Sequence, residues 1–422
     1  KNAFTLDDNA LRKIADDFRA DMRAGLAGEK SATLRMLRSY ADLPSGKESG
    51  SFLALDFGGT NVRALRILLR GDGTYEVLRK VAKPLTVAGV YDYVSADATA
   101  EDMFDFLAAI IDEAIAGDRK TKYLLGHTFS FPSQQTNLYN AKLIVWTKEF
   151  ATRGVEGKVV NDLLKEALVR RGMTNVTPVA VINDTVAVLL SAAYINGDTQ
   201  IGAIYATGHN TCYLEPYTGK AEPPMILNME SGGFQKLTPN HFDIALDAAS
   251  EKPGEQRLEK MVGGRYMGTL FDMALAELLG EQGRLYGFTS VDISRILEDQ
   301  SDAADCASGI VEMMTGRRLS EEDASRVREL AHAIVVRSVR LMTATFAGTM
   351  WQVAGAGKIR RQHIAVDGSV YEKMPHVTEN IMRAFSELLG EDAALVDTLL
   401  AGGGSGLGAA LAAAMTAHEA QA

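Results

Sequence analysis

Apolar residues recur at helical spacing near the start of the chain. Leu11, Ile14, Phe18 and Met22 fall on one face of residues 6–28, which predicts an amphipathic helix. Its polar face carries charges of both signs, whereas a helix that lies on a membrane surface has a basic face. We therefore expect this helix to pack against the rest of the protein.

Two hairpins are predicted from short apolar runs that flank a glycine-containing turn. They comprise strands 52–57 and 62–69 around turn 58–61, and strands 201–206 and 212–215 around turn 207–211. A P-loop or dinucleotide-binding glycine loop leads into a helix, but each of these turns leads into a second strand. Two such hairpins in separate halves of the chain indicate a duplicated architecture with a cleft between two lobes.

Further helical stretches alternate with apolar strands, which is typical of an α/β fold with mixed sheets. The expected helices are 100–115, 160–171, 268–279, 321–349 and 407–416, and the expected strands are 122–131, 179–182 and 363–367. From this order we expect an N-terminal helical segment (1–45) packed on the large lobe, a small lobe (46–183) completed by the C-terminal helix 405–422, and a large lobe (184–404).

Composition narrows the class of protein. The chain has 422 residues, 46% of them hydrophobic, which is enough for two or three lobes with their own cores. Its formal net charge of −10 repels nucleic acid and anionic membranes, so we expect neither as a partner. An anionic substrate then needs a local binding device.

The cysteine content and the apolar runs bear on localisation. Cys212 and Cys306 are too few for a disulfide scaffold or a four-cysteine zinc site, and they fit a reducing cytoplasm. The longest apolar run, near residues 186–195, has half the length of a membrane-spanning helix. Acidic residues interrupt the first twenty positions, which argues against a signal peptide. We therefore expect a cytoplasmic protein.

The first hairpin, LALDFGGTNVRALRI, carries groups suited to binding phosphate. Gly58 and Gly59 let backbone N–H groups approach phosphate oxygens, and Thr60 and Asn61 add side-chain donors. The alternative is a plain hairpin turn whose glycines serve geometry alone.

Two charged residues flank that turn. Asp56 ends the first strand, where a carboxylate is placed to hold a magnesium ion directly or through water. Arg63 is placed to stabilise charge on a phosphoryl group during its transfer.

The second hairpin, IYATGHNTCYLE, and a C-terminal glycine run add candidates for anion binding. Thr207 and Gly208 are suited to gripping the β- and γ-phosphates of a nucleotide, with Asn210 facing the cleft. Gly404 and Ser405 end a run of four small residues, and Ser405 is a natural N-cap. A helix N-terminus binds anions through its free N–H groups and its dipole. A simple cap is the alternative, but four small residues exceed what a cap needs, so we favour nucleotide contact.

Five short polar clusters among apolar residues have the character of a sugar site, because a ring of hydroxyls requires several fixed donors and acceptors. The residues are Ser130, Thr147, Lys148, Asn183, Asp184, Glu230 and Glu259. Each has a plain structural alternative, as a satisfied buried polar group or a helix cap. Asp184, for example, is also placed to cap a helix that starts at Thr185.

Asp184 is the best candidate for a catalytic base in phosphoryl transfer. It lies where an apolar strand ends and a helix begins, the usual edge of a cleft in α/β folds. Because the reference pKa of an aspartate is about 4, it is a weak base that takes the hydroxyl proton late and orients the hydroxyl before that. Lys148 and Arg63 would offset negative charge near the transferred group.

Ordered motifs over residues 34–414 resemble those of the eukaryote-type hexokinases and glucokinases. They read LRMLRSYADLPSGKESGSFLALDFGGTNVRALRI, GHTFSFPSQQTNLYNAKLIVWTKEF, VINDTV, ATGHNTCYLE, NMESGGF, EKMVGGRYMG, AVDGSVYEKMPHV and GGGSGLGAALAAA. The resemblance implies a two-lobed actin-like ATPase fold, a duplicated ribonuclease H-like architecture with an interdomain cleft. It also implies ATP-dependent phosphorylation of a hexose, with glucose expected, at the 6-hydroxyl, giving hexose 6-phosphate and ADP in the first step of glycolysis.

The resemblance assigns roles to residues by motif match. Sugar contacts are implied for Ser130, Thr147, Lys148, Asn183, Asp184, Asn210, Glu230 and Glu259, with Asp184 as the base. Contacts with ATP or its phosphates are implied for Gly58, Gly59, Thr60, Asn61, Arg63, Thr207, Gly208, Arg265, Gly404 and Ser405, and proximity to magnesium for Asp56. The expected cofactors are ATP and Mg²⁺, and the expected assembly is a monomer or a homodimer.

The chain departs from the family pattern at several positions. Gly403 stands where relatives usually carry an acidic residue, and Ser231 stands where many place a Trp. The chain is also shorter than a typical single-unit eukaryotic member. The cysteine-rich zinc motif of the ROK-type sugar kinases has no counterpart among two cysteines, which argues against that family.

Two related functions stay open. One is a kinase that prefers mannose, fructose or glucosamine, and the other is a sugar-sensing protein of the same fold with weak activity. The presence of Asp184, Lys148 and Arg63 argues against the second, as does the lack of a basic helix-turn-helix pattern. A heat-shock-type or actin-type ATPase would leave the sugar clusters unexplained.

Overall fold

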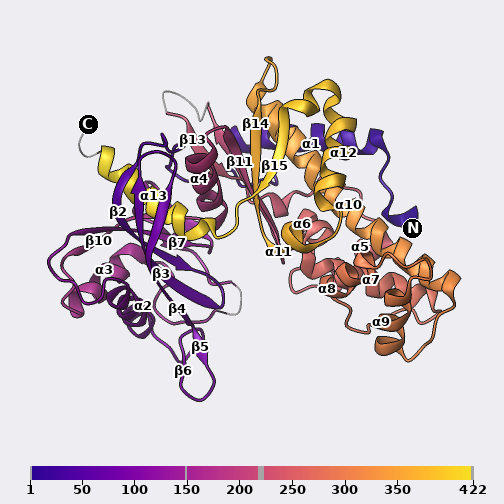
Figure 1. The fold of residues 1–422 in the computed structure, drawn as a ribbon, viewed down its shortest axis with the longest axis horizontal. Coiled ribbons are helices and arrows are strands. Elements are labelled where there is room, and N and C mark those ends of the chain that lie inside the picture. Colours follow the sequence, from indigo (N-terminus) through magenta and orange to yellow (C-terminus); the bar gives the residue numbers. More distant parts are fainter. Residues whose placement is uncertain (1, 148–149, 217–222, 420–422) are drawn as a thin grey trace. The chain divides into compact units, whose positions relative to one another are not determined.

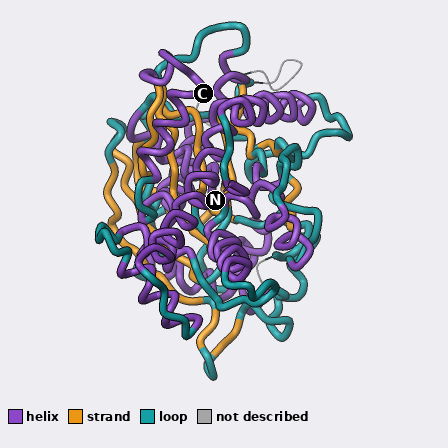
Figure 2. Tube along the Cα trace, turned by 90° about the vertical axis from the view of Figure 1, so that its right-hand side faces the viewer, coloured by secondary structure: helices purple, strands orange, loops and turns teal. Residues whose placement is uncertain are grey.

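The computed structural model describes residues 2–147, 150–216 and 223–419. The chain forms two compact units (Figure 1). Unit 1 comprises residues 1–36, 203–211 and 229–400, and unit 2 comprises residues 37–202, 212–228 and 401–422. The structure contains both helices and strands (Figure 2), in agreement with the predicted α/β class.

A five-stranded mixed sheet forms the centre of unit 2. In spatial order its strands are β10 (Val176–Ile182), β7 (Tyr123–Phe129), β2 (Ser49–Phe57), β3 (Asn61–Arg70) and β4 (Tyr75–Pro84). β2, β3 and β4 are antiparallel neighbours, whereas β7 runs parallel to β2, and β10 runs parallel to β7. The first predicted hairpin is confirmed, and the carboxyl ends of three parallel strands share one edge of the sheet.

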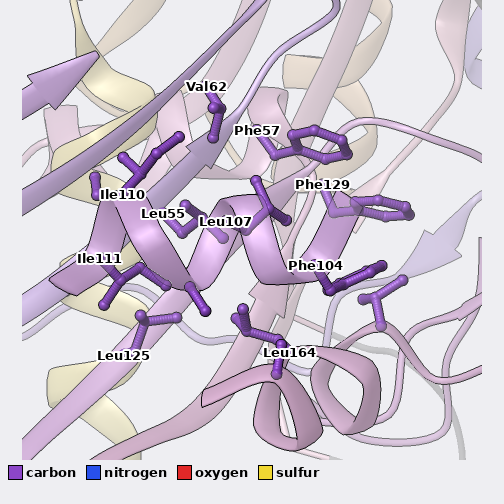
Figure 3. Close-up of a cluster of buried hydrophobic side chains, with 14 of the residues drawn as sticks. Leu55, Phe57, Val62, Phe104, Leu107, Ile110, Ile111, Leu125, Phe129 and Leu164 are labelled. Atoms are coloured by element: carbon purple, nitrogen blue, oxygen red, sulfur yellow. The ribbon is translucent and has the colours of Figure 1, made fainter. Parts of the chain in front are cut away.

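The described residues of unit 2 also form the helices α2 (Ala100–Ala114), α3 (Val160–Arg170), α4 (Asp184–Asn196) and α13 (Gly404–Glu419). Successive residues of a strand point to opposite faces of the sheet. Leu55 and Phe57 of β2 therefore join a hydrophobic cluster with Phe104 and Leu107 of α2 (Figure 3). Ala54 joins a second cluster, formed with α4 and α13. The sheet of unit 2 is thus covered by helices on both faces.

Glycines bring α13 very close to its neighbours in unit 2. A Cβ added at Gly126 of β7 would overlap the carbonyl of Ala409, and one added at Gly408 would overlap backbone atoms of Ala187 in α4. Close-packed interiors leave no room for an extra methyl group at such contacts. The small residues of the last motif therefore have a packing role.

Short strands complete the remainder of unit 2. The pairs are β5 (Thr86–Val87) with β6 (Tyr91–Asp92), β8 (Ser133–Gln134) with β9 (Lys142–Leu143), and β1 (Leu37–Arg38) with β13 (Met225–Asn228), which also pairs with β12. β11 (Thr199–Tyr205) and β12 (His209–Glu215) run from one unit into the other and form the second predicted hairpin. Its turn is 206–208, so Asn210 lies in the strand and not in the predicted turn.

Unit 1 is mainly helical. Its helices are η1 (Asn2–Phe4), α1 (Asp8–Leu26), η2 (Ser231–Gly233), α5 (His241–Ala249), α6 (Arg257–Val262), α7 (Gly264–Leu278), α8 (Ser290–Glu298), α9 (Asp305–Thr315), α10 (Glu321–Ala354), α11 (Ser369–Lys373), α12 (Val377–Leu389) and η3 (Gly390–Leu395). β14 (Gln362–Asp367) and β15 (Val396–Leu400) form a parallel pair.

The long helix α10 packs against α1, α12 and several other helices of unit 1. By length and composition it is the one described helix that could cross a membrane. Arg337 and Arg340 interrupt its sequence, so it contains no long uninterrupted apolar run. However, 83% of its apolar stretch is buried inside the structure, as in the core helix of a globular unit. The helix predicted at 6–28 is confirmed as α1 and packs on α10 as expected.

The structure differs from the predictions at several boundaries. α13 begins at Gly404 and not at 407, because residues 402 and 403 form the preceding turn. Ser405 therefore lies inside the first turn, and the prediction that it is the N-cap is wrong. The compact units also divide the chain at other positions than the predicted lobes, since α4 packs on α13 and lies in unit 2.

Candidate functional site

Several predicted site residues lie at the carboxyl ends of the parallel strands in unit 2. Asp56 is the next-to-last residue of β2, Ser130 follows β7, and Asn183 and Asp184 follow β10. In the register of the sheet, Thr128 of β7 lies opposite both Asp56 and Ile182, so the three strand ends are level. Ligands of α/β proteins bind at this edge of a sheet.

Asp184 is the first residue of α4 and is half-buried. The cap is its neighbour Asn183, whose side chain accepts a hydrogen bond from the Thr185 N–H at 2.9 Å. Oδ1 of Asp184 lies 2.8 Å from the same N–H. The alternative in which Asp184 serves as the cap is therefore wrong, and the positive end of the helix dipole favours its carboxylate.

Cys212 supports the same turn of α4, a role that the sequence interpretation missed. Its buried thiol donates a hydrogen bond to the carbonyl of Thr185 at 3.2 Å. Burial raises the pKa of this thiol well above its usual range, so it remains protonated. The position of Cys212 in the second hairpin motif is the sequence feature that could have indicated this role.

The turn of the first hairpin is exposed. Thr60 and Asn61 are exposed, and the Gly58 N–H donates to the carbonyl of Asn61 at 3.2 Å. Asp56 is only 8% exposed, and its Oδ2 accepts from Nη1 of Arg63 at 2.8 Å. The two residues face each other across β2 and β3, so the groups assigned to magnesium and to phosphoryl charge form one ion pair.

The C-terminal glycine run divides into two parts. Gly404 is buried, its N–H donates to Ala401, and its carbonyl accepts from the Ser191 hydroxyl at 2.6 Å. Gly402 and Gly403 are exposed, and an added Cβ would meet no atom within 4 Å at either. The structure thus gives Gly404 a packing role and leaves the two preceding glycines accessible.

Aromatic side chains support the segment between Ser130 and Thr147. Trp146 contacts the ring of Phe131 edge-on at 4.8 Å and stacks on Phe150 at 5.0 Å. The indole N–H of Trp146 donates to the carbonyl of Thr152 at 2.8 Å. Thr147, the next residue, is half-buried, and Lys148 lies outside the described residues. Such packing fixes the backbone beside Thr147.

In unit 1 the turn of the second hairpin rests on the start of α7. The N–H groups of Gly264 and Arg265 donate to the carbonyls of Ala206 and Thr207 at 2.8 and 3.1 Å. The side chain of Arg265 pairs with Glu251 at 2.8 Å on the surface, and this hydrogen bond raises the pKa of the guanidinium. Thr207 is exposed.

Three predicted sugar residues come together in unit 1. Oε2 of Glu259 in α6 accepts from the His209 N–H at 3.1 Å and lies against Gly208, where there is no room for a Cβ. Oδ1 of Asn210 accepts from the Ser231 N–H at 3.2 Å, which places Asn210 beside the residue that follows Glu230. In the sequence, Glu230 and Glu259 lie 20 and 49 positions after Asn210.

Glu230 has a left-handed backbone, with φ 53° and ψ 48°. Non-glycine residues adopt this conformation at a cost, and such residues are concentrated at functional sites. The next residues form η2, which packs on α6. Two carboxylates and one amide therefore lie on adjoining elements, a set that can both donate to and accept from sugar hydroxyls.

Comparison with known proteins identifies related chains. Family models described as hexokinase match residues 1–194 and 200–415. Hexokinase-1 of Oryza sativa subsp. japonica is 36% identical over 446 residues, covering 97% of this chain and 88% of the relative. Hexokinase-2 of Rattus norvegicus is also 36% identical, over 440 residues and 97% of this chain, but the chain spans only 47% of its length.

Solved structures resemble the whole chain as well. A crystal structure of a hexokinase is 31% identical with a TM-score of 0.88, covering 98% of this chain and 97% of that one. The hexokinase of Schistosoma mansoni complexed with glucose is 29% identical with a TM-score of 0.81 and the same coverage. These likenesses confirm the predicted two-lobed actin-like kinase fold.

Proposed function

The chain belongs to the hexokinase family, and we propose that it transfers the terminal phosphate of ATP to the 6-hydroxyl of glucose, giving glucose 6-phosphate and ADP. The observation that carries this proposal is the position of Asp184, a half-buried carboxylate at a strand end and at the start of α4. The glucose complex of the Schistosoma relative supports glucose as the substrate.

The proposed glucose contacts fall into two groups of residues. One group comprises Ser130, Thr147, Asn183 and Asp184, and the other comprises Asn210, Glu230 and Glu259. Lys148 belongs to the proposal by motif alone. Carboxylates accept from the sugar hydroxyls, whereas amides and hydroxyls both donate and accept. A site built this way rejects analogues that lack a hydroxyl, because its polar groups would be left unpaired.

In the proposed reaction Asp184 orients the 6-hydroxyl and accepts its proton. The hydroxyl oxygen forms a bond to the γ-phosphorus of ATP, the bond from that phosphorus to the β–γ bridging oxygen breaks, and ADP leaves with the electron pair. Proton transfer to Asp184 takes place late, as the new bond forms. Arg63, whose side chain is 42% exposed, would exchange its bond with Asp56 for the charge on the transferred group.

ATP is proposed to bind through the two hairpin turns. The exposed residues of these turns are Gly59, Thr60 and Asn61 in the first and Thr207 in the second. Gly58, Gly208 and Arg265 lie in or beside these turns, whereas Gly404 and Ser405 would act by holding the start of α13. Backbone N–H groups in such turns bind phosphate oxygens without bulky side chains in the way.

Magnesium is proposed to accompany ATP near Asp56. Within the described part of the chain, no three or more His, Cys, Asp or Glu side chains gather as a metal site. This fits Mg²⁺, which keeps several waters and is held by one or two carboxylates plus phosphate oxygens. When bound, the ion would neutralise phosphate charge, and Asp56 is the carboxylate placed to hold it.

The proposal is tested by measuring ADP release by the purified chain with MgATP, with and without glucose. We expect glucose-dependent ADP formation with the phosphate recovered on the sugar. The proposal is contradicted if folded protein releases no ADP in response to glucose, mannose, fructose or glucosamine. That result would favour a sugar-sensing role. A higher kcat/KM for one of the other three sugars would replace glucose as the substrate. From the cysteine content we propose that the protein acts in the cytoplasm.

A further inference from the structure

A buried carboxylate in α1 is connected by hydrogen bonds and an ion pair to the loop that carries Glu230. Asp21 has no exposed surface. Its Oδ2 accepts from the Thr33 hydroxyl at 2.6 Å and from the Leu34 N–H at 3.0 Å, and Nζ of Lys236 lies 2.8 Å from its Oδ1. A buried charge with this many donors is satisfied, and it fixes the groups that satisfy it.

The hydroxyl of Thr33 relays this contact to residues 229–236, here called the Glu230 loop. It donates to Asp21 and accepts from the N–H of Gln235 at 3.2 Å. Two residues further along, the N–H of Arg35 donates to the carbonyl of Met229 at 3.0 Å. The segment after α1 therefore holds the Glu230 loop at both of its ends.

Apolar packing reinforces the same attachment. Phe234 is fully buried and meets the ring of Phe18 in α1 edge-on, with centroids 5.0 Å apart. Gly233 lies against the carbonyl of Thr33, 3.5 Å from where its Cβ would be. The loop thus docks on α1 and its following segment over most of its length.

This docking bears on Glu230 because of its backbone. A left-handed non-glycine residue persists only where the surrounding structure over-determines it. Met229, the residue before Glu230, is hydrogen-bonded to Arg35 through its carbonyl. After Glu230, Gln235 is hydrogen-bonded to Thr33, and Lys236 pairs with Asp21. The conformation that directs the Glu230 side chain is therefore held from α1.

We infer that Asp21, acting through Thr33, is a positioning residue for hexose binding. It touches neither sugar nor nucleotide in the proposed reaction, and it sets the backbone of a glucose-binding carboxylate from another element. This inference rests on the proposed function, because it assigns Glu230 to the sugar. The rival interpretation is that the network only anchors α1, in which case its loss lowers stability and leaves glucose binding unchanged.

The test is to remove the relay and keep the carboxylate. Thr33→Val has the same shape and lacks the hydroxyl, so Gln235 loses its acceptor while Thr33 N and Leu34 N still satisfy Asp21. We expect the KM for glucose to rise about tenfold, since misplacement of a binding group by 1 Å costs up to about a hundredfold. The KM for ATP should not change, and Thr33→Ser, which restores the hydroxyl, should restore the glucose KM.

Thr343→Val is the matched control. Thr343 is also in unit 1 and buried, and its hydroxyl donates to Val339 within α10 at 2.8 Å, away from the sugar residues. This variant should lower the unfolding temperature at an unchanged glucose KM. The same result for Thr33→Val would overturn the inference.

Two further outcomes are separated in advance. If the unmodified chain shows no glucose-dependent ADP release, the proposed function fails first. If Thr33→Val does not fold, Lys236→Met replaces it, because the Lys236 side chain is 38% exposed and tolerates change. Loss of this partly exposed ion pair should raise the glucose KM about two- to fivefold, and an unchanged KM would contradict the role of Asp21.

Discussion

Neighbouring residues fix the position of Asp184 at the start of α4. Asn183 takes the cap of α4, and the Cys212 thiol bonds the carbonyl of Thr185, so the first turn of the helix is held from both sides. Asp184 is therefore not needed as the cap. Its carboxylate points from a rigid element, which favours a catalytic role that depends on orientation.

Replacement of Asp184 by Asn is expected to lower kcat by at least about a hundredfold, because the amide keeps the shape but cannot accept the proton. The measurement is the glucose-dependent release of ADP at saturating substrates. Asp198→Asn, at an exposed position just after the other end of α4, is the control and should keep full activity. A loss of less than tenfold for Asp184→Asn would mean that another group accepts the proton.

The ion pair of Asp56 and Arg63 shows what residue types alone cannot reveal. Each was assigned its own partner, magnesium for the carboxylate and phosphate for the guanidinium. The turn of the first hairpin sets a register in which the two residues face each other, and they bond at 2.8 Å. The register of the hairpin decides which residues form cross-strand pairs, and the length of the turn sets that register.

At the scale of elements, the packing of α13 revises the interpretation of the last motif, GGGSGLGAALAAA. The glycine run was interpreted as a nucleotide loop with Ser405 as cap. In the structure the helix starts earlier, and Gly408 together with Gly126 of β7 allows backbone contact with α4 and the sheet. The exposed glycines of this motif are Gly402 and Gly403.

Gly126→Ala is expected to destabilise the protein by about 1–3 kcal/mol or more, because the new methyl group overlaps the Ala409 carbonyl. The shift in the urea unfolding midpoint measures it. Gly309→Ala in α9 is the control, since an added Cβ there meets no atom within 4 Å and alanine stabilises a helix by about 0.5–1 kcal/mol. Equal midpoints for Gly126→Ala and the unmodified chain would refute the close packing of α13.

At the scale of the whole molecule, the proposed sugar residues come from parts of the chain that are far apart in sequence. Glucose should therefore slow amide hydrogen exchange at two segments, residues 183–187 and residues 229–235. Ligand binding stabilises whatever it contacts in the folded state, and local opening is suppressed there. L-glucose serves as the control and should leave both segments unchanged. Slower exchange in only one segment would show that the other does not take part in binding.

The sequence by itself predicted many of the elements and the family. Periodicity predicted α1, the two hairpins and the main helices, because burial on one face leaves a local pattern. Motifs read along the chain identified the family and the residues suited to sugar and phosphate, since these motifs consist of neighbouring residues.

Only the tertiary structure decided how distant residues combine. Asn210 accepts a hydrogen bond from Ser231, which follows Glu230, and Glu259 accepts one from His209, which precedes Asn210. Asp21 of α1 pairs with Lys236 of the Glu230 loop. The same structure showed that Gly404 serves packing and that Asn183, not Asp184, is the cap. Such contacts join residues that are far apart in the sequence. A local pattern of residues does not indicate which distant segments will come together.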